Sequence, residues 1–394
     1  MSARNLSMLL LLALLAAACS KDKDVDRPAK LVAIHETLHP SRIWSANVHG
    51  TKVPLRLGLG LAAEGGTVYA AGYKGEVAAY DLTTGHMRWE RRTKLPLGGG
   101  PGVSSELVVV GSIDGDVLAL AAADGTVRWR ASIGAEILAP AAVSDRVVVV
   151  RAVDGKMHGL AVGDGHELWV QQQQVPRLSL RGTSHPQLVG DVAICGFDNG
   201  RVVAANLADG TTAWEATLMV PHGKTELERL DDIDSPPVAV GNDVYVTGFQ
   251  GKVAMLALDS GQIWWSQDLS SYRGLAVDDD AVYVSTADGQ VVALRRRAGT
   301  ELWRQKGLLH RGITAPVVSG TTVAVADFQG YVHWLDKKTG ALVARERAGK
   351  RRYINPPLAV DNEVIVINES GAITAYRTAP QVASTQRAGK DGGG

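Results

Sequence analysis

The chain has 394 residues, 45% of them hydrophobic and 21% charged, which is a globular rather than a disordered composition. Its 41 basic side chains balance its 41 acidic ones, so the formal net charge at pH 7 is zero. This balance excludes the strongly basic footprint by which many proteins bind phosphate backbones, and we expect no nucleic acid partner.

The N-terminus predicts an export signal. Arg4 supplies a positive charge, and the apolar run 8–18 is shorter than the roughly 20 residues that a membrane-spanning helix needs. Small residues precede Cys19, as in a bacterial lipobox, where a peptidase cuts before a cysteine whose thiol is acylated. We predict a lipoprotein signal peptide at 1–18, lipidation of Cys19 and a lipidated tether at 19–42. An ordinary secretory signal is the alternative.

Cysteine use limits the chemistry of the chain. If Cys19 is acylated, Cys195 is the only remaining thiol, and no intramolecular disulfide can form. Cys195 lies in the apolar stretch 192–196, which predicts a small buried side chain rather than a reactive nucleophile.

Most of the chain repeats about every 40 residues. A glycine closes a turn once per repeat, at Gly75, Gly115, Gly155, Gly200, Gly251, Gly289, Gly330 and Gly371. Ten residues after the first seven of these comes a second glycine, at Gly85, Gly125, Gly165, Gly210, Gly261, Gly299 and Gly340. Four residues later stands a tryptophan, at Trp89, Trp129, Trp169, Trp214, Trp265 and Trp303, and Ala344 breaks the series.

Each repeat predicts a propeller blade. In the first repeat, 67–72, 76–80 and 87–89 read as short strands separated by glycine turns, and a further strand precedes each set, as at 139–143. Four antiparallel strands in about 40 residues make one blade. We therefore predict an all-β, eight-bladed β-propeller of four-stranded antiparallel blades at 43–378, with the repeated tryptophans buried between blades.

The ends of the repeat array predict how the ring closes. Trp44 lies in a fourth-strand pattern that no other strands precede, and the eighth repeat stops near Tyr376 after its third strand. The N-terminal strand should complete the last blade and leave no open sheet edge. Trp44 then joins the six repeat tryptophans as an interblade residue. Residues 379–394, rich in glycine and polar groups, predict a disordered tail.

Two successive connections between blades are enlarged. Trp89 and Gly115 are 26 residues apart, whereas Trp169 and Gly200 are 31 apart and Trp214 and Gly251 are 37 apart. Connections of this kind emerge on one face of a propeller, so the two should form one surface for a protein partner. Its predicted contact residues are Leu178, Leu180 and Arg181 in the first connection, and Arg229, Asp232 and Asp234 in the second.

The sequence gives little support for any known catalytic or metal-binding motif. We predict no enzyme activity, no metal and no cofactor. The acids at 231–234 lack the spaced ligands and central glycine of a calcium loop, and the histidines form no zinc motif. The glycines at 58–60 precede no amphipathic helix that could bind a pyrophosphate. The glycine-rich run 98–102 reads as a flexible blade connection.

The glycine and tryptophan register resembles that of pyrroloquinoline quinone-type eight-bladed propellers. Together with the lipobox, residues 31–378 resemble the BamB family of outer-membrane lipoproteins, most specifically at 178–182, 225–234 and 308–311. The resemblance implies a scaffold, lipid-anchored on the periplasmic face of the outer membrane. Its implied partners are the periplasmic domains of BamA, the barrel-bearing subunit of the assembly machine, and unfolded outer-membrane protein strands.

The alternative is a periplasmic quinoprotein-like redox enzyme or ligand sensor that uses the central channel. Quinoprotein dehydrogenases share the repeat but carry adjacent cysteines and a calcium-binding acid cluster. This chain has no Cys-Cys pair.

Overall fold

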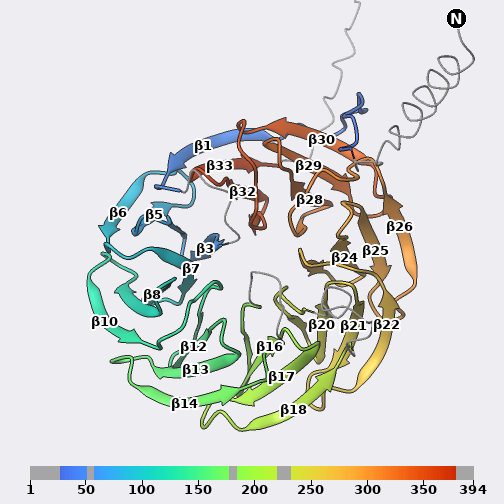
Figure 1. Ribbon diagram of the computed structural model, residues 1–394. Coiled ribbons are helices and arrows are strands. Elements are labelled where there is room, and N and C mark those ends of the chain that lie inside the picture. Colours follow the sequence, from blue (N-terminus) through green and yellow to red (C-terminus); the bar gives the residue numbers. More distant parts are fainter. Residues whose placement is uncertain (1–26, 51–56, 177–183, 220–231, 379–394) are drawn as a thin grey trace, which may run out of the picture.

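The computed structural model describes residues 27–50, 57–176, 184–219 and 232–378. These residues form eight sheets arranged as blades around a central axis (Figure 1). The first strands of neighbouring blades contact one another around the axis, and the fourth strands lie on the outer rim. The predicted all-β, eight-bladed propeller is confirmed. Among the described residues, no helix has the length and apolar character needed to cross a membrane.

The first four blades follow the chain order. Blade 1 contains β3 (Leu61–Glu64), β4 (Thr67–Ala71), β5 (Glu76–Asp81) and β6 (Met87–Arg92). Blade 2 contains β7 (Leu97–Val103), β8 (Leu107–Ser112), β9 (Asp116–Ala121) and β10 (Val127–Ser132), with β2 (Gly58–Leu59) added in parallel to β7. Blade 3 contains β11 (Ala142–Val143), β12 (Val147–Arg151), β13 (Lys156–Ala161) and β14 (Glu167–Gln172). Blade 4 contains β15 (Gln187–Val189), β16 (Val192–Gly196), β17 (Arg201–Asn206) and β18 (Thr212–Thr217).

The other four blades complete the ring. Blade 5 contains β19 (Val238–Val240), β20 (Asp243–Thr247), β21 (Lys252–Ala257) and β22 (Ile263–Asp268). Blade 6 contains β23 (Leu275–Val277), β24 (Ala281–Ser285), β25 (Val291–Arg295) and β26 (Glu301–Gln305). Blade 7 contains β27 (Val317–Ser319), β28 (Thr322–Ala326), β29 (Tyr331–Asp336) and β30 (Leu342–Arg347). Blade 8 contains β31 (Leu358–Val360), β32 (Glu363–Ile367), β33 (Ala372–Arg377) and β1 (Ser41–Asn47).

The core lies in the interfaces between blades. The middle strands are buried on both faces, as in β4, where all five residues are buried. Stacking between two neighbours removes the alternation of polar and apolar residues that a sheet with one wet face would show. The outer strands keep partial exposure, and in β6 only Trp89 is buried.

Each repeat tryptophan contacts the following blade. The indole Nε1 atoms donate hydrogen bonds of 2.7–3.0 Å to backbone carbonyls of that blade, in the pairs Trp44–Leu82, Trp89–Ala122, Trp129–Val162, Trp169–Leu207, Trp214–Leu258, Trp265–Arg296 and Trp303–Lys337. All seven indoles are buried except that of Trp265, which is partly exposed. The predicted interblade position of the tryptophans agrees with these contacts.

The second glycine of the repeat makes room for this indole. A Cβ added at Gly125 would lie 2.5 Å from Cε3 of Trp89, and the backbone there has a φ of +70°. The same close approach joins Trp44 to Gly85, Trp129 to Gly165, Trp169 to Gly210, Trp214 to Gly261, Trp265 to Gly299 and Trp303 to Gly340. The tryptophan and glycine that define the sequence repeat are thus partners across seven of the blade interfaces, not within a blade.

Ala344 breaks the tryptophan series at the interface where this glycine turn is missing. The third and fourth strands of blade 8, β33 and β1, come from opposite ends of the chain and are not joined by a hairpin. Trp334 stands opposite Ala344 in the neighbouring strand, is fully buried, and packs edge-on against Tyr376 of blade 8 at 5.5 Å. In blade 1 the tryptophan lies on the fourth strand opposite an alanine on the third, as Trp89 lies opposite Ala79. In blade 7 the positions are reversed, with Trp334 on the third strand and Ala344 on the fourth.

The predicted closure by the N-terminal strand is also confirmed. β1 pairs antiparallel with β33, with Ala46 opposite Ile373 and Asn47 opposite Ala372 (Figure 1). Trp44 is 6% exposed in this closed blade.

The interpretation of residues 98–102 as a flexible connection was wrong. They lie in β7, where all but Val103 are buried. Cβ atoms at Gly99 and Gly102 would clash with backbone carbonyls of Ala139 and Ala141 in blade 3. The glycines allow two backbones to approach closely, and their lack of side chains, rather than flexibility, explains the run.

We expect the tryptophan and glycine of one interface to be energetically coupled. Trp89→Ala should lower the free energy of unfolding by about 3–5 kcal/mol, the usual loss for a buried aromatic residue. Gly125→Ala should also destabilise, but less in the Trp89→Ala background, because only the strain of positive φ, about 1–2 kcal/mol, then remains. Denaturant unfolding of the two single variants and the double variant measures the coupling. Trp264→Ala is the control, since that indole is 58% exposed, and additive effects would contradict the coupling.

Candidate functional site at the connection face

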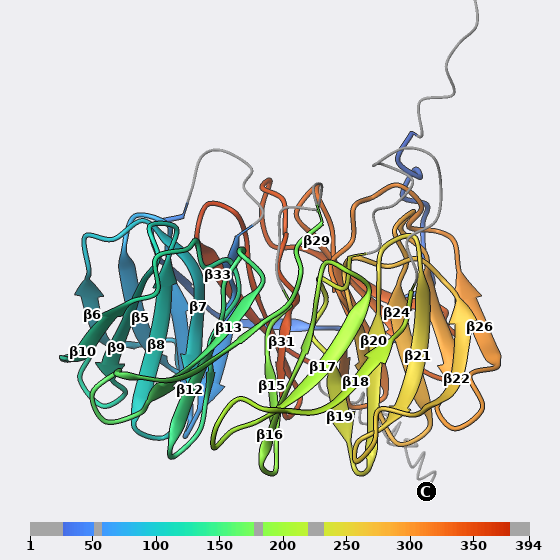
Figure 2. The same cartoon turned by 60° about the horizontal axis from the view of Figure 1, so that its bottom comes forward.

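The described parts of the connections between successive blades lie at one end of the propeller. These connections bond to the turns between second and third strands, as in Thr93 N to Gly75 O at 2.7 Å and Ile133 N to Gly115 O at 2.9 Å. We call this end, which is uppermost in Figure 2, the connection face. The opposite end carries the hairpins against which the tryptophans pack.

The two enlarged connections meet at their roots. Their described parts are 173–176 and 184–186 in the first, and 218–219 and 232–237 in the second. Ser184 Oγ donates a buried hydrogen bond of 3.0 Å to the carbonyl of Ser235 and accepts one from Gly196 N at 3.2 Å. The predicted neighbours therefore lie side by side where the structure describes them. Leu178, Leu180, Arg181 and Arg229 lie outside the described residues.

The second connection passes between blades 4 and 5. Ile233 is fully buried, and its backbone N–H donates to Phe197 O at 3.3 Å. Asp232 is also fully buried, its carbonyl accepts from Phe249 N at 2.9 Å, and Asp234 is partly buried. Asp232 is one of the predicted contact residues, and in this chain by itself its side chain is buried. Ile233, an apolar residue between acids, is the anchor that sequence reasoning missed.

A buried arginine lies in blade 3 beside the first connection. Arg151 is 1% exposed, its Nη2 is 3.5 Å from Asp198 Oδ1, and its guanidinium lies 4.4 Å from the centre of the Phe197 ring. Burial raises the pKa of the Asp198 carboxyl, and Arg151 opposes that rise. Burial also raises the pKa of Cys195 to about 11, so its thiol is protonated at neutral pH. The predicted burial of Cys195 is confirmed.

The described part of the predicted tether is bound to blades 6 and 7. We call residues 27–40 the leader. Ala29 N donates to Leu309 O at 2.9 Å, and the N–H groups of Thr37 and Leu38 donate to Val343 O at 3.0 and 3.2 Å. Leu31 and Leu38 pack against the apolar cores of these blades.

Two arginines link the leader to a buried polar network. Arg311, 2% exposed, donates to Asp327 Oδ2 from Nε and Nη2 at 2.8 and 2.6 Å, and to Ala29 O from Nη1 at 2.9 Å. Arg345 donates to Val32 O at 3.0 Å and to His333 Nδ1 at 3.3 Å. The other ring nitrogen of His333 lies 3.0 Å from Asp327 Oδ2. His333 therefore accepts at Nδ1 and donates at Nε2, which is the pattern of a neutral imidazole.

Burial sets the protonation states of this network. Desolvation lowers the pKa of His333, although Asp327 opposes the change. Burial by itself would raise the pKa of Asp327, but the hydrogen bonds from His333, Tyr331 N and Arg311 leave that pKa below its usual value. Asp327 is thus ionised and His333 neutral at pH 7.

We expect stability to fall on mild acidification because of His333. Its folded-state pKa lies below the ordinary value of 6.5, so the unfolded chain takes up the proton first and stability is lost as pH falls below 6.5. One such group gives a slope of at most about 1.4 kcal/mol per pH unit. Urea unfolding between neutral and mildly acidic pH should show a shallower slope for His333→Gln. Partly buried His185, whose pKa desolvation also lowers, should keep the slope above zero.

The control for this prediction is His86→Gln, since His86 is exposed in a hairpin turn. It should keep the slope of the parent protein. An unchanged slope in His333→Gln would assign the acid sensitivity to other groups.

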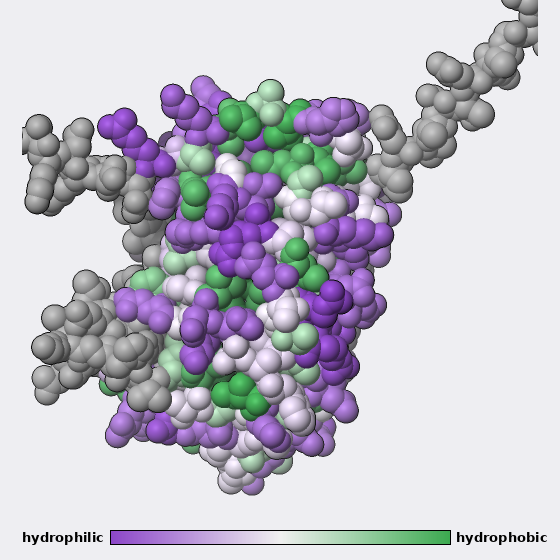
Figure 3. Space-filling model, turned by 90° about the vertical axis from the view of Figure 1, so that its right-hand side faces the viewer, coloured by the Kyte–Doolittle hydropathy of each residue, from purple (hydrophilic) through white to green (hydrophobic). Residues whose placement is uncertain are grey.

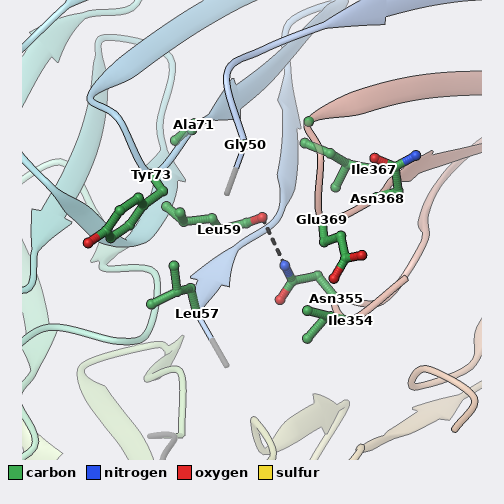
Figure 4. A pocket seen from close by; sticks show the side chains of 12 residues that line it. Gly50, Leu57, Leu59, Ala71, Tyr73, Ile354, Asn355, Ile367, Asn368 and Glu369 are labelled. Carbon is green, nitrogen blue, oxygen red and sulfur yellow. Dashed lines mark hydrogen bonds between the residues drawn. The ribbon is translucent and has the colours of Figure 1, made fainter. Parts of the chain in front are cut away.

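Two described cavities bear on the ligand-binding alternative. One of about 40 Å³ lies at the seam between blades 8 and 1, where Asn355 Nδ2 donates to Leu59 O at 2.8 Å (Figure 4). That volume is far below the roughly 300 Å³ of a typical small-molecule site. The other, of about 610 Å³, lies at the hairpin end beside Trp264 and Arg297, away from the connection face. Among the described residues, no three His, Cys, Asp or Glu side chains are placed to hold a metal ion.

The outer rim mixes hydrophilic and apolar side chains, as Figure 3 shows for the side that carries β22 and β26. The exposed large hydrophobics there are Ile263, Trp264 and Leu302. They are spread over two blades rather than gathered at the connection face.

Comparison with known proteins agrees with the fold and the repeat. The family model described as outer membrane protein assembly factor BamB matches residues 31–96, 74–305 and 287–380. The BamB of Pseudomonas aeruginosa is 44% identical over 369 residues, covering 93% of this chain and 97% of that protein. The crystal structure of BamB from Moraxella catarrhalis has a TM-score of 0.80 at 28% identity, covering 86% of this chain and 100% of that one.

A quinohemoprotein alcohol dehydrogenase from Comamonas testosteroni shares the fold alone, with a TM-score of 0.67 at 11% identity over 86% of this chain and 76% of that one. The structure and these similarities define a closed propeller of the assembly-factor class rather than a dehydrogenase. The chain belongs to the BamB family of outer membrane protein assembly factors.

Proposed function

We propose that this protein is a non-enzymatic scaffold lipoprotein of the outer-membrane β-barrel assembly machine. In this role it binds the periplasmic domains of BamA and supports the folding and insertion of outer-membrane proteins. Family membership supports the general role. Contact with unfolded outer-membrane protein strands is a further part of the proposal.

The observation that carries the proposed partner surface is the joining of the two enlarged connections. Ser184 and Ser235 are buried and hydrogen-bonded to each other, so the described roots of the two connections are joined to each other. Ile233 fixes the second connection between two blades. A partner surface with a fixed base loses less conformational freedom on binding than two independent loops would. Leu178, Leu180, Arg181, Arg229 and Asp234 are the proposed contact residues, and Asp232 acts from beneath the surface.

We propose that Cys19 carries lipid and anchors the protein at the periplasmic face of the outer membrane. Cys19→Ser should abolish incorporation of labelled palmitate, because the hydroxyl cannot replace the thiol in acylation. The variant should also leave the outer-membrane fraction. Unchanged labelling would refute the lipoprotein assignment without bearing on the propeller.

We expect Leu180→Ala and Arg181→Ala each to weaken capture of BamA. Loss of one hot-spot side chain typically costs about 2 kcal/mol or more, roughly a thirtyfold loss of affinity. Capture from detergent extracts by the purified parent and variants measures the effect, with the melting temperature of each variant recorded beside it. Full capture by both folded variants would place the interface elsewhere.

Two further variants give this test its controls. Asp114→Ala changes an ordinary blade turn on the same face and should capture BamA normally. Asp232→Ala removes a fully buried carboxyl, so it should lower the melting temperature as well as capture. Separating those two effects distinguishes a supporting residue from a contact residue.

A further inference from the structure

A run of basic side chains crosses the connection face beside the leader. Residues 345–352 contain five basic side chains and one acidic one. Arg347, Lys350, Arg351 and Arg352 are exposed, as are Arg27 and Lys30 at the start of the leader. We call these six residues the basic strip. Because the whole chain has no net charge, the basic strip is a local excess of positive charge.

The two parts of the strip lie close together. Arg311 donates to Ala29 O, and its guanidinium lies 6.0 Å from the centre of the Tyr331 ring. The guanidinium of Arg347 lies 5.1 Å from the same ring. Two side chains, those of Arg311 and Tyr331, therefore connect the start of the leader to Arg347. The connection 348–357 continues the strip toward blade 8, where Glu369 N donates to Arg352 O at 3.0 Å.

The charges of the strip are largely uncompensated. Arg352 has a long ion pair of 3.9 Å with Glu369, and Arg347 Nε donates to the backbone of Gly349. Within the described residues, Lys350 and Arg351 form no ion pair. The nearby acid Glu346 is partly buried, and burial together with Glu36 raises its pKa.

The position of the strip fits a membrane surface. From Cys19 to Ala29, ten residues of fully extended chain reach at most about 35 Å, whereas an unbound leader would allow about 75 Å up to Ser41. Docking of the leader therefore holds this part of the connection face near the lipid. Among the exposed large hydrophobics of the described residues, only Val32 lies beside the strip, so the surface lacks the apolar centre of a protein interface.

We propose that the basic strip binds the anionic headgroups of phospholipids, giving the protein a second membrane contact that orients the propeller. This inference rests on the proposed lipid anchor for its setting, but the contact itself needs no acyl chain. Each basic residue near an anionic membrane increases the partitioning of a protein from solution onto that membrane by about fivefold. A lipid chain combined with a basic patch then fixes orientation as well as attachment.

The first experiment uses residues 20–394, which include every described strand but lack the lipid and the export signal. Binding is measured by co-sedimentation with phosphatidylcholine vesicles and with vesicles containing about one third phosphatidylglycerol. We expect binding only to the anionic vesicles, weakening as ionic strength rises. The Lys350→Glu/Arg351→Glu variant should bind at least tenfold more weakly.

The matched control is Arg128→Glu/Lys338→Glu, which makes the same charge change at exposed residues of the hairpin end. It should bind anionic vesicles like the parent. Equal loss in the two double variants would show an effect of net charge and overturn the proposal, as would equal binding of the parent to both kinds of vesicle.

A second readout tests orientation in the intact lipoprotein. With Lys350→Cys, labelling by a membrane-impermeant thiol reagent should be slower in anionic than in neutral vesicles, and buried Cys195 gives little background. Equal labelling rates would overturn the orienting role.

Capture of BamA by the same variants separates this inference from the proposed function. Lys350→Glu/Arg351→Glu should still capture BamA from detergent. If it loses capture but keeps vesicle binding, the strip is a protein contact and the lipid proposal is wrong. If the parent itself fails to capture BamA, the proposed function fails while the vesicle results stand.

Discussion

The ring depends on the contact between an indole on the outer strand of one blade and a glycine hairpin of the next. In the seven interfaces that have it, the indole fills the volume left by the missing Cβ and satisfies a backbone carbonyl of the same hairpin. Both requirements fix the position of the indole relative to the next blade. Because the contact repeats with nearly the same geometry, the blades follow one another at a regular angle and the ring closes. Glycine is needed twice over there, for space and for positive φ.

This contact also explains how much of the fold could be predicted. The glycine and tryptophan register is visible in the sequence because both partners recur at fixed positions. For the same reason, Trp44 indicated the strand that closes the ring. Ala344 could be seen only as a gap, because its cause is the absence of a hairpin between strands from opposite chain ends. The glycines of β7 were misread because composition alone cannot distinguish a flexible glycine from one that lets two backbones approach.

The neighbouring positions of the two enlarged connections were predictable, but the burial of individual side chains within them was not. The regular repeat supplied a baseline length, and the two longer connections stood out against it. A connection from an outer strand to the next inner strand must cross a blade interface, so part of it becomes core, as Ile233 and Asp232 do. Arg151 and Arg311 escaped prediction because arginine is usually a surface residue. Here buried acids and aromatic rings accommodate them.

The leader is held to the propeller in part by the buried polar network of blade 7. Arg311 and Arg345 divide their donors between the blade 7 network and carbonyls of the leader. Leaving such a part-buried donor without an acceptor costs about 1–3 kcal/mol, while ordering the backbone costs about 1–2 kcal/mol per residue. These bonds alone do not hold the leader, and the packing of partly buried Leu31 and Leu38 against blades 6 and 7 adds to its binding. Any contact that favours the bound state of the leader, such as the proposed one between the basic strip and a lipid surface, would therefore also limit the distance between the propeller and the proposed lipid anchor.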